Sequence, residues 1–280
     1  MAGPSSRVCP FCQGLNSADE RSCYRCGRPL PGRATSGTIH WARSLLGTEA
    51  PASRAIIGLC LLVLALSVSA DRALPLFMGQ FSAWSQMRFG AADTLLDGIE
   101  PWRYLSAIFV HANLVHVGMN LFWFARIGGP AEQEFGSARF LLLCLLSGAL
   151  GFVACDVWYA LAGGGHVMTV GASGLVFGVF GSVVGVRYAR RDPTWRDVLV
   201  QNVVYLAIMS LAFSVSTPAH VGGLATGALL GFLFSKEPRT LRLTPVFGIL
   251  AVLLFLAAVA GVFLSAVSPF WRQLRDSALG

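Results

Sequence analysis

Long apolar segments separated by short polar connections occupy most of the chain beyond residue 54. An α-helix needs about 20 consecutive, mainly apolar residues to cross the hydrocarbon core of a bilayer. The pattern predicts membrane-spanning helices at 55–70, 104–125, 140–161, 171–187, 199–217, 219–235 and 243–267. The connection at 71–102 mixes aromatic residues with glycine and polar residues, which predicts a loop at the membrane interface; a disordered loop is the alternative.

The amino-acid composition excludes several other classes of protein. Of the 280 residues, 55% are hydrophobic and 12% are charged, whereas soluble domains contain about 25% charged residues. An intrinsically disordered chain, a disulfide-rich secreted domain and an ordinary cytosolic enzyme are therefore excluded. The sequence predicts an all-α polytopic membrane protein.

The basic residues predict the orientation in the membrane. With the predicted spans, roughly three times as many Lys and Arg residues lie on the side of the amino terminus as on the other side, as cytoplasmic loops require. We expect a cytoplasmic amino terminus and an outside carboxyl terminus. The net charge of +7 then reflects topology, so no nucleic-acid partner is expected. The lack of an amino-terminal targeting segment and the span count favour a prokaryotic inner membrane.

Residues 1–35 form a predicted cytoplasmic head, and 36–54 a linker. The head contains two Cys-x-x-Cys pairs, formed by Cys9, Cys12, Cys23 and Cys26. Each pair can hold one side of a tetrahedral metal ion, which predicts a structural zinc ribbon; redox-active pairs are the alternative. A segment this short has no core of its own, so metal binding would supply its folding energy. The head could recruit a cytoplasmic partner.

Four polar side chains within the predicted spans are candidates for function, because polar groups in a membrane are costly. His116 and Asn120 share one face of the second span, since they lie four residues apart. Ser173 lies at the start of the fourth span and His220 at the start of the sixth. These three spans run in the same direction, so His116, Ser173 and His220 are predicted in the outer part of the bilayer.

The fourth and sixth spans carry pairs of glycines four residues apart, which would let their backbones approach closely. These are Gly174, Gly178, Gly181, Gly185, Gly223, Gly227 and Gly231. Helix packing without chemistry would account for the glycines, but it leaves Ser173 and His220 unexplained.

A serine within hydrogen-bonding reach of a histidine is an activated nucleophile with its general base. An acyl transfer also needs donors for the oxyanion, and His116, Asn120 and the Ser173 N–H could supply them. Asp156, the only acidic residue within a predicted span, is expected at the interface and not beside His220. The residues therefore predict a Ser-His dyad and not a triad.

These motifs together resemble the rhomboid family of intramembrane serine proteases, over residues 53 to 237. The motifs are Trp102-Arg103, His111 with His116 and Asn120, Gly128-Gly129 with Glu132 and Gly136, Gly171-Ala172-Ser173-Gly174, and Ala219-His220 with Gly223 and Gly227. Phe177 departs from the pattern, since relatives often carry tyrosine there. The span at 243–267 and the head lie outside the family's common core.

The resemblance implies a six-helix bundle at 55–237 around a water-filled cavity. It implies Ser173 as nucleophile and His220 as base, with His116 and Asn120 lining the oxyanion hole and no cofactor for catalysis. Trp102 and Arg103 would stabilise an outer loop, and His111 would support the site. The implied substrates are single-pass membrane proteins, cut near the outer end of their transmembrane helix. Transmembrane proteins and the lipid bilayer are therefore the expected partners.

Two other functions are compatible with parts of the pattern. A catalytically inactive relative could bind transmembrane segments as a chaperone or scaffold, although such proteins usually lose the serine or the histidine. A metal transporter could use the membrane histidines, but the spans lack the carboxylates that usually share such a site.

Overall fold

The computed structural model describes residues 6–9, 15–30, 50–72, 74–75, 79–212, 216–236 and 244–279. The strands are β1 (Ser6–Val8), β2 (Leu15–Ser17), β3 (Ala92–Asp93) and β4 (Met168–Thr169). The helices are α2 (Pro51–Asp71), α3 (Ala83–Arg88), α4 (Arg103–Ser106), α5 (Leu114–Phe135), α6 (Ser137–Leu161), α7 (Ser173–Ala189), α8 (Trp195–Ala212), α9 (Thr217–Lys236), α10 (Thr244–Val267) and α11 (Phe270–Leu279).

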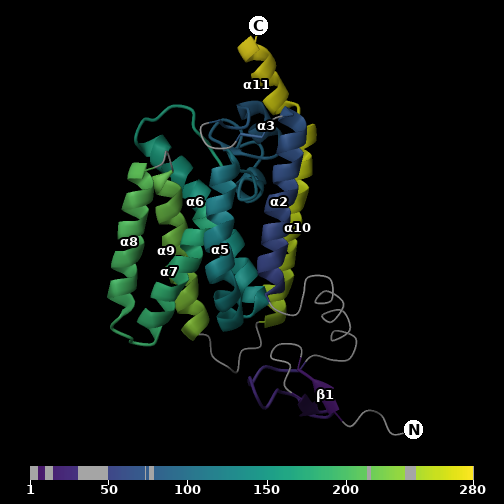
Figure 1. The fold of residues 1–280 in the computed structure, drawn as a ribbon, viewed down its shortest axis with the longest axis vertical. Coiled ribbons are helices and arrows are strands. Elements are labelled where there is room, and N and C mark those ends of the chain that lie inside the picture. Colours follow the sequence, from purple (N-terminus) through teal and green to yellow (C-terminus); the bar gives the residue numbers. More distant parts are fainter. Residues whose placement is uncertain are drawn as a thin grey trace, which may run out of the picture.

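The long helices form one bundle (Figure 1). Helix α3 and α11 lie at one end of it, which we call the α11 end, and the β1–β2 hairpin lies at the other, which we call the head end. Among the described residues, α2, α6, α9 and α10 are long and apolar enough to cross a membrane, and α7 is a shorter apolar helix. The prediction of an all-α polytopic membrane protein is confirmed.

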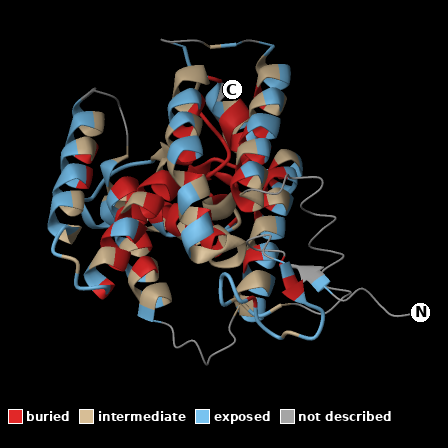
Figure 2. Cartoon of the chain, turned by 60° about the horizontal axis from the view of Figure 1, so that its bottom comes forward, coloured by how far each residue is buried: buried red, intermediate tan, exposed pale blue. Residues whose placement is uncertain are grey.

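The buried residues lie in the middle of the bundle, and its outward helix faces are exposed (Figure 2). Large apolar side chains are exposed on these faces, including Leu211 at 89% and Ile249 at 62%. In a soluble protein such surfaces would be an aggregation liability, whereas in a bilayer they meet lipid. Helix α10, which continues the chain beyond the six-helix part, packs against α6 and α4.

The predicted bounds of the second span, 104–125, are wrong. Residues 103–106 form the separate helix α4, and α5 begins only at Leu114. Asn113 starts it: its backbone is extended and its side-chain oxygen accepts the N–H of His116 at 2.8 Å. At the other end, Pro130 lies inside α5 and Gly136 is its cap. Gly128 and Gly129, which lie beyond the predicted end of the span, are therefore part of the helix, and so is Pro130, as membrane bundles tolerate.

Helix α2 begins four residues earlier than predicted, at Pro51, whose fixed φ suits a first helical turn. Its amino-terminal N–H groups are satisfied by Glu132 from α5. The carboxylate accepts the N–H of Ala52 at 3.0 Å and the N–H of Ser53 at 2.9 Å. A carboxylate there also matches the positive end of the helix dipole. Glu132 is 3% exposed, so this bond ties α2 to α5 at the head end.

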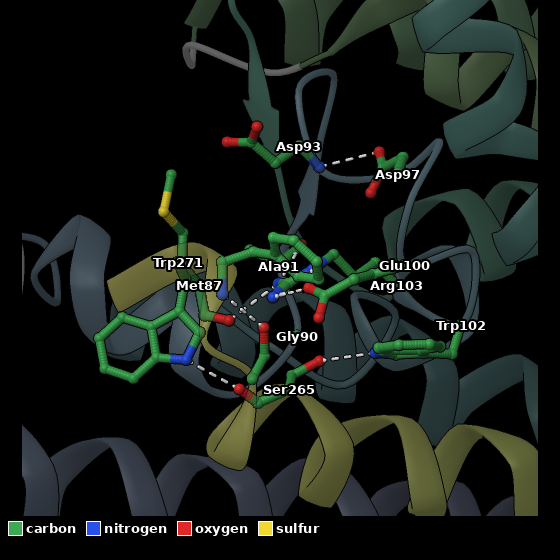
Figure 3. Close-up of polar contacts among 12 residues, drawn as sticks. Met87, Gly90, Ala91, Asp93, Asp97, Glu100, Trp102, Arg103, Ser265 and Trp271 are labelled. Atoms are coloured by element: carbon green, nitrogen blue, oxygen red, sulfur yellow. Dashed lines mark hydrogen bonds and ion pairs between the residues drawn. The ribbon is translucent and has the colours of Figure 1, made fainter. Parts of the chain in front are cut away.

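The connection between α2 and α4 is packed over its described part, which contradicts the disordered alternative for those residues. Arg103 is fully buried, and its guanidinium donates to Glu100 at 2.6 Å, to the Met87 carbonyl at 2.8 Å and to the Ala91 carbonyl at 3.1 Å (Figure 3). Buried charge is tolerated when it is paired and hydrogen-bonded. Arg103 therefore holds the connection together through these hydrogen bonds, which agrees with the stabilising role that the resemblance implies for it.

Helix α10 joins this connection through Ser265. The Trp102 indole N–H donates to Ser265 Oγ at 3.1 Å, and the Trp271 indole N–H donates to the Ser265 carbonyl at 2.9 Å (Figure 3). Trp271 lies at the start of α11, and it packs with Met87 and Leu96. Helix α10 thus packs against the rest of the protein at the α11 end and does not stand apart from it.

Candidate active site

A tight approach of α7 and α9 positions the site. A Cβ atom on Gly223 would collide with the carbonyl oxygen of Gly174, and one on Gly227 would collide with that of Gly178. The glycines therefore let the two backbones touch, as the small-residue spacing predicted. Ser173 and His220 lie near the first turns of these two helices, so their side chains meet at the α11 end.

Ser173 and His220 form a direct hydrogen bond. His220 Nε2 lies 2.6 Å from Ser173 Oγ, and the imidazole is 3% exposed. The Phe177 ring stacks on the imidazole, with ring centroids 4.7 Å apart. No described group hydrogen-bonds to His220 Nδ1. The arrangement is the predicted pair without a third member.

The turn before Ser173 lies against His116. Gly171, two residues before the serine, has φ +119°, a conformation that favours glycine. A Cβ there would lie 2.6 Å from His116 Nε2 and 3.5 Å from Asn120 Nδ2. A side chain at 171 would therefore displace His116, whereas it would only make van der Waals contact with Asn120.

His111 supports the same turn from the segment before α5. Its Nε2 accepts the N–H of Ala172 at 3.4 Å, and its Nδ1 lies 3.2 Å from the Phe109 carbonyl. Because a carbonyl only accepts, the proton of the neutral ring must be on Nδ1. The ring also faces His116, with centroids 5.1 Å apart. This position agrees with the support that the resemblance implies for His111.

All four predicted residues open into one cavity of about 480 Å³. It is lined by side chains from α5, α7, α8 and α9, among them His116, Asn120, Ser173, Tyr205, Met209 and His220. Asn120 is 7% exposed, and its buried Nδ2 has no acceptor among the described groups. A buried donor without an acceptor is costly, so it is available to a substrate oxygen.

Sequence reasoning missed Tyr205 on α8. Its ring lies 5.8 Å from Phe177 and 5.3 Å from Trp123, between centroids, so it extends the aromatic packing behind His220. A single tyrosine among the aliphatic residues of that span was the available signal. The sequence did not show which side of α8 faces the cavity, because its polar and apolar residues are not separated onto different faces.

The head brings cysteines together as predicted. The sulfur atoms of Cys9, Cys23 and Cys26 lie within 4.8 Å of one another, and the Cys9 and Cys26 sulfurs are 3.7 Å apart. Four sulfurs bound at about 2.3 Å to a tetrahedral zinc are about 3.8 Å apart. The described part of the cluster therefore fits a zinc ion. Cys12, the fourth predicted ligand, lies outside the described residues.

Comparison with known proteins identifies a protein family that part of the chain matches. Residues 99–237 match the rhomboid domain. RHOMBOID-like protein 6, mitochondrial, from Arabidopsis thaliana is 29% identical over 172 residues, which are 59% of this chain and 54% of that protein. Rhomboid protease GluP from Bacillus subtilis (strain 168) is 28% identical over 204 residues, 70% of this chain and 38% of GluP.

A third relative is Rhomboid protease GlpG from Klebsiella pneumoniae (strain 342), which is 30% identical over 152 residues, 50% of this chain and 51% of GlpG. The chain thus spans about half, or less, of the length of these curated relatives. The matched range of the domain includes the four cavity residues, whereas the head and α10 lie outside it.

Proposed function

Because the chain carries a rhomboid domain at 99–237 and so belongs to the rhomboid family, we propose that it is an intramembrane serine endopeptidase. It would hydrolyse peptide bonds of single-pass transmembrane proteins through the Ser173–His220 dyad. The observation that carries this proposal is the 2.6 Å hydrogen bond between Ser173 Oγ and His220 Nε2 inside a cavity.

In the proposed first step, Ser173 Oγ attacks the scissile carbonyl carbon while His220 Nε2 accepts the hydroxyl proton. This requires the neutral imidazole to carry its own proton on Nδ1. The negative oxygen of the tetrahedral intermediate would be stabilised by His116, Asn120 and the Ser173 N–H. His220 then donates the proton to the leaving amine as the C–N bond breaks, which leaves an acyl-enzyme.

In the second step, a water molecule donates a proton to His220 and attacks the ester carbonyl. The collapse of the second intermediate releases the new carboxyl group, and the proton returns to Ser173. The reaction needs no cofactor. Water has to reach the dyad within the bilayer, and the polar side chains lining the cavity support such access.

The substrate proposal follows from the fact that a transmembrane helix hides its carbonyls in its own hydrogen bonds. A substrate must therefore unwind before Ser173 can attack it. The dyad lies at the α11 end, so cleavage is proposed near the end of the substrate helix on that side of the membrane. A single-pass helix with small residues beside the cut would open most readily.

We further propose the orientation and the membrane. The amino terminus and the head are placed in the cytoplasm, and the α11 end and the carboxyl terminus outside, on the basis of the basic residues. A prokaryotic inner membrane is proposed as the location. The relatives come from both plants and bacteria, so they favour neither source.

The domain boundaries are also proposals: a head at 1–35, a linker at 36–54, the protease domain at 55–237 and the additional helix at 243–267. The head would hold one structural zinc ion through Cys9, Cys12, Cys23 and Cys26, and could recruit a cytoplasmic partner. The zinc would fix the turn in which Gly27 donates to the Cys23 carbonyl at 2.8 Å; it has no part in catalysis.

The experiment is cleavage of a tagged generic transmembrane substrate by purified protein in detergent or vesicles. Wild type is compared with Ser173→Ala and with the control Ser182→Ala, which changes a buried serine on α7 whose hydroxyl donates to the Val179 carbonyl at 2.7 Å. We expect cleavage by wild type and the control and none by Ser173→Ala. Equal cleavage by all three would remove Ser173 as nucleophile.

The scaffold function predicts a different outcome. A protein that only binds transmembrane segments would retain the tagged substrate and cleave it in none of the variants. The hydrogen-bonded dyad gives no support to that function, and we do not carry it further.

A further inference from the structure

A buried thiol on α6 contacts both of the segments that lead to the dyad. Cys155 is 1% exposed, and its Sγ lies 3.1 Å from Ser216 Oγ and 3.6 Å from Thr169 Oγ1. Ser216 and Thr169 both line the active-site cavity. The thiol therefore lies directly behind the cavity wall.

Ser216 connects this thiol to His220. It immediately precedes α9, and its carbonyl accepts the N–H of His220 at 3.2 Å. This hydrogen bond closes the first turn of the helix, from which the imidazole projects. A contact that holds the Ser216 side chain therefore also restricts the backbone that carries His220.

Thr169 connects the same thiol to Ser173. It lies in β4, four residues before the proposed nucleophile, and the N–H of Gly171 between them donates to the Ala107 carbonyl at 2.9 Å. The segment that leads into α7 is thus held at Gly171 by Ala107 and at Thr169 by Cys155.

Helix packing fixes the position of the thiol. Helix α6 packs against both α7 and α9 (Figure 1). Gly151 lies one turn before Cys155 on the same face of α6, and a Cβ atom there would lie 2.6 Å from the Ala219 carbonyl oxygen. The backbones of α6 and α9 are therefore in direct contact beside Ser216, which sets the distance from the Cys155 side chain to the start of α9.

A thiol is chemically suited to this position. It has one S–H donor and a sulfur that can accept, both of them weak. It can donate to one hydroxyl and accept from the other at the same time, which links β4 to the start of α9. Alanine would remove both hydrogen bonds, whereas serine keeps one donor and an acceptor.

We propose that Cys155 is a positioning residue for the dyad: by holding Thr169 and Ser216, it sets the distance between Ser173 and His220. This inference rests on the proposed function. The role is geometric, because a shift of either segment would change the 2.6 Å hydrogen bond across which the proton passes.

The test compares three variants of the full chain with wild type. Cys155→Ala removes both hydrogen bonds, and Cys155→Ser keeps a group that can donate and accept. Cys144→Ala is the matched control, because Cys144 is a fully buried thiol on the same helix that packs in the hydrophobic core. The melting temperature and the rate at which a fluorophosphonate probe labels Ser173 are measured for each protein.

Both alanine variants should lose a similar amount of melting temperature, since each loses the packing of one buried sulfur. Only Cys155→Ala should be labelled more slowly, by about tenfold, because small displacements of a reacting pair are costly. Cys155→Ser should recover most of that rate. With a cleavable transmembrane substrate, Cys155→Ala should lower kcat and leave KM almost unchanged, because the thiol lies behind the cavity wall.

A double-mutant cycle assigns the effect to the two hydroxyl groups. Ser216→Ala and Thr169→Val are made together, once in the wild-type chain and once in Cys155→Ala. If the thiol acts through these hydroxyls, Cys155→Ala should slow labelling much less when both are already absent. An undiminished loss would mean that the thiol acts by another route, and it would overturn the proposal.

Equal labelling rates in wild type, Cys155→Ala and Cys144→Ala would also overturn it. So would a Cys155→Ser variant as slow as Cys155→Ala, because packing and not hydrogen bonding would then account for the loss. These outcomes are distinct from a failure of the proposed function, in which Ser173 of wild type is not labelled at all and the inference falls with it.

Discussion

At the scale of single residues, the dyad depends on what surrounds the imidazole. His220 receives the Phe177 ring on one face, and Ser173 on Nε2. The phenol hydroxyl that relatives often carry at position 177 is missing, but ring stacking does not require it. Phe177 thus limits the rotation of His220 and keeps Nε2 directed at the serine.

Asn120 permits a prediction about the oxyanion. Asn120→Ala removes one donor while His116 and the Ser173 N–H remain, so we expect the turnover number to fall by about 10²-fold and KM to change little. Steady-state cleavage kinetics would measure this. Asn202→Ala is the matched control, since Asn202 is a buried asparagine on α8 that donates to the Phe180 carbonyl at 3.4 Å. An Asn120→Ala enzyme as fast as wild type would exclude Asn120 from the oxyanion hole.

The catalytic candidates could be predicted from the sequence because polar side chains stand out in apolar spans. Ser173, His220, His116 and Asn120 all reach one cavity. Their roles remain proposals. The contribution of Tyr205 could not be predicted, because it depends on the rotation of α8.

At the scale of elements, the contact between α7 and α9 decides where the dyad lies. Gly223→Leu should drive the two helices apart, because its Cβ would meet the Gly174 carbonyl. Overpacking of this kind costs about 1–3 kcal/mol or more, so we expect a lower melting temperature and loss of cleavage.

The control for this change is Gly58→Leu on α2, where nothing lies within 4 Å of the added Cβ. Unchanged stability and activity in Gly223→Leu would show that the helices do not pack through this glycine. Glycine spacing was sufficient to predict this contact. The hydropathy pattern was not sufficient to predict where α5 begins and ends. The asparagine cap at its start and the proline inside it are local features that hydropathy does not detect.

At the scale of the whole molecule, the structure joins parts that the sequence treated as separate. Ser265 of α10 accepts a hydrogen bond from Trp102, and Arg28 of the head donates to the Gln133 carbonyl at the end of α5, at 3.2 Å. The additional helix and the head therefore both contact the rhomboid domain. Periodicity and motif spacing identify such parts, but long-range contacts between them are set by side-chain packing.

The head supplies a prediction about metal content. Purified wild type should hold about one zinc per chain, and Cys9→Ser with Cys26→Ser should release it while the melting temperature of the membrane part stays unchanged. Metal analysis beside thermal unfolding would measure both. Cys155→Ala, at a cysteine on α6, is the control and should keep the zinc. Retention of zinc by the double variant would place the metal elsewhere.

The central claim is that His220 activates Ser173 as a nucleophile. The most direct measurement is labelling of folded protein with a fluorophosphonate probe, followed by mass spectrometry to identify the modified residue. The account predicts modification of Ser173 in wild type and its loss in His220→Ala. No modification of Ser173 in folded wild type, or equal modification in both proteins, would contradict it.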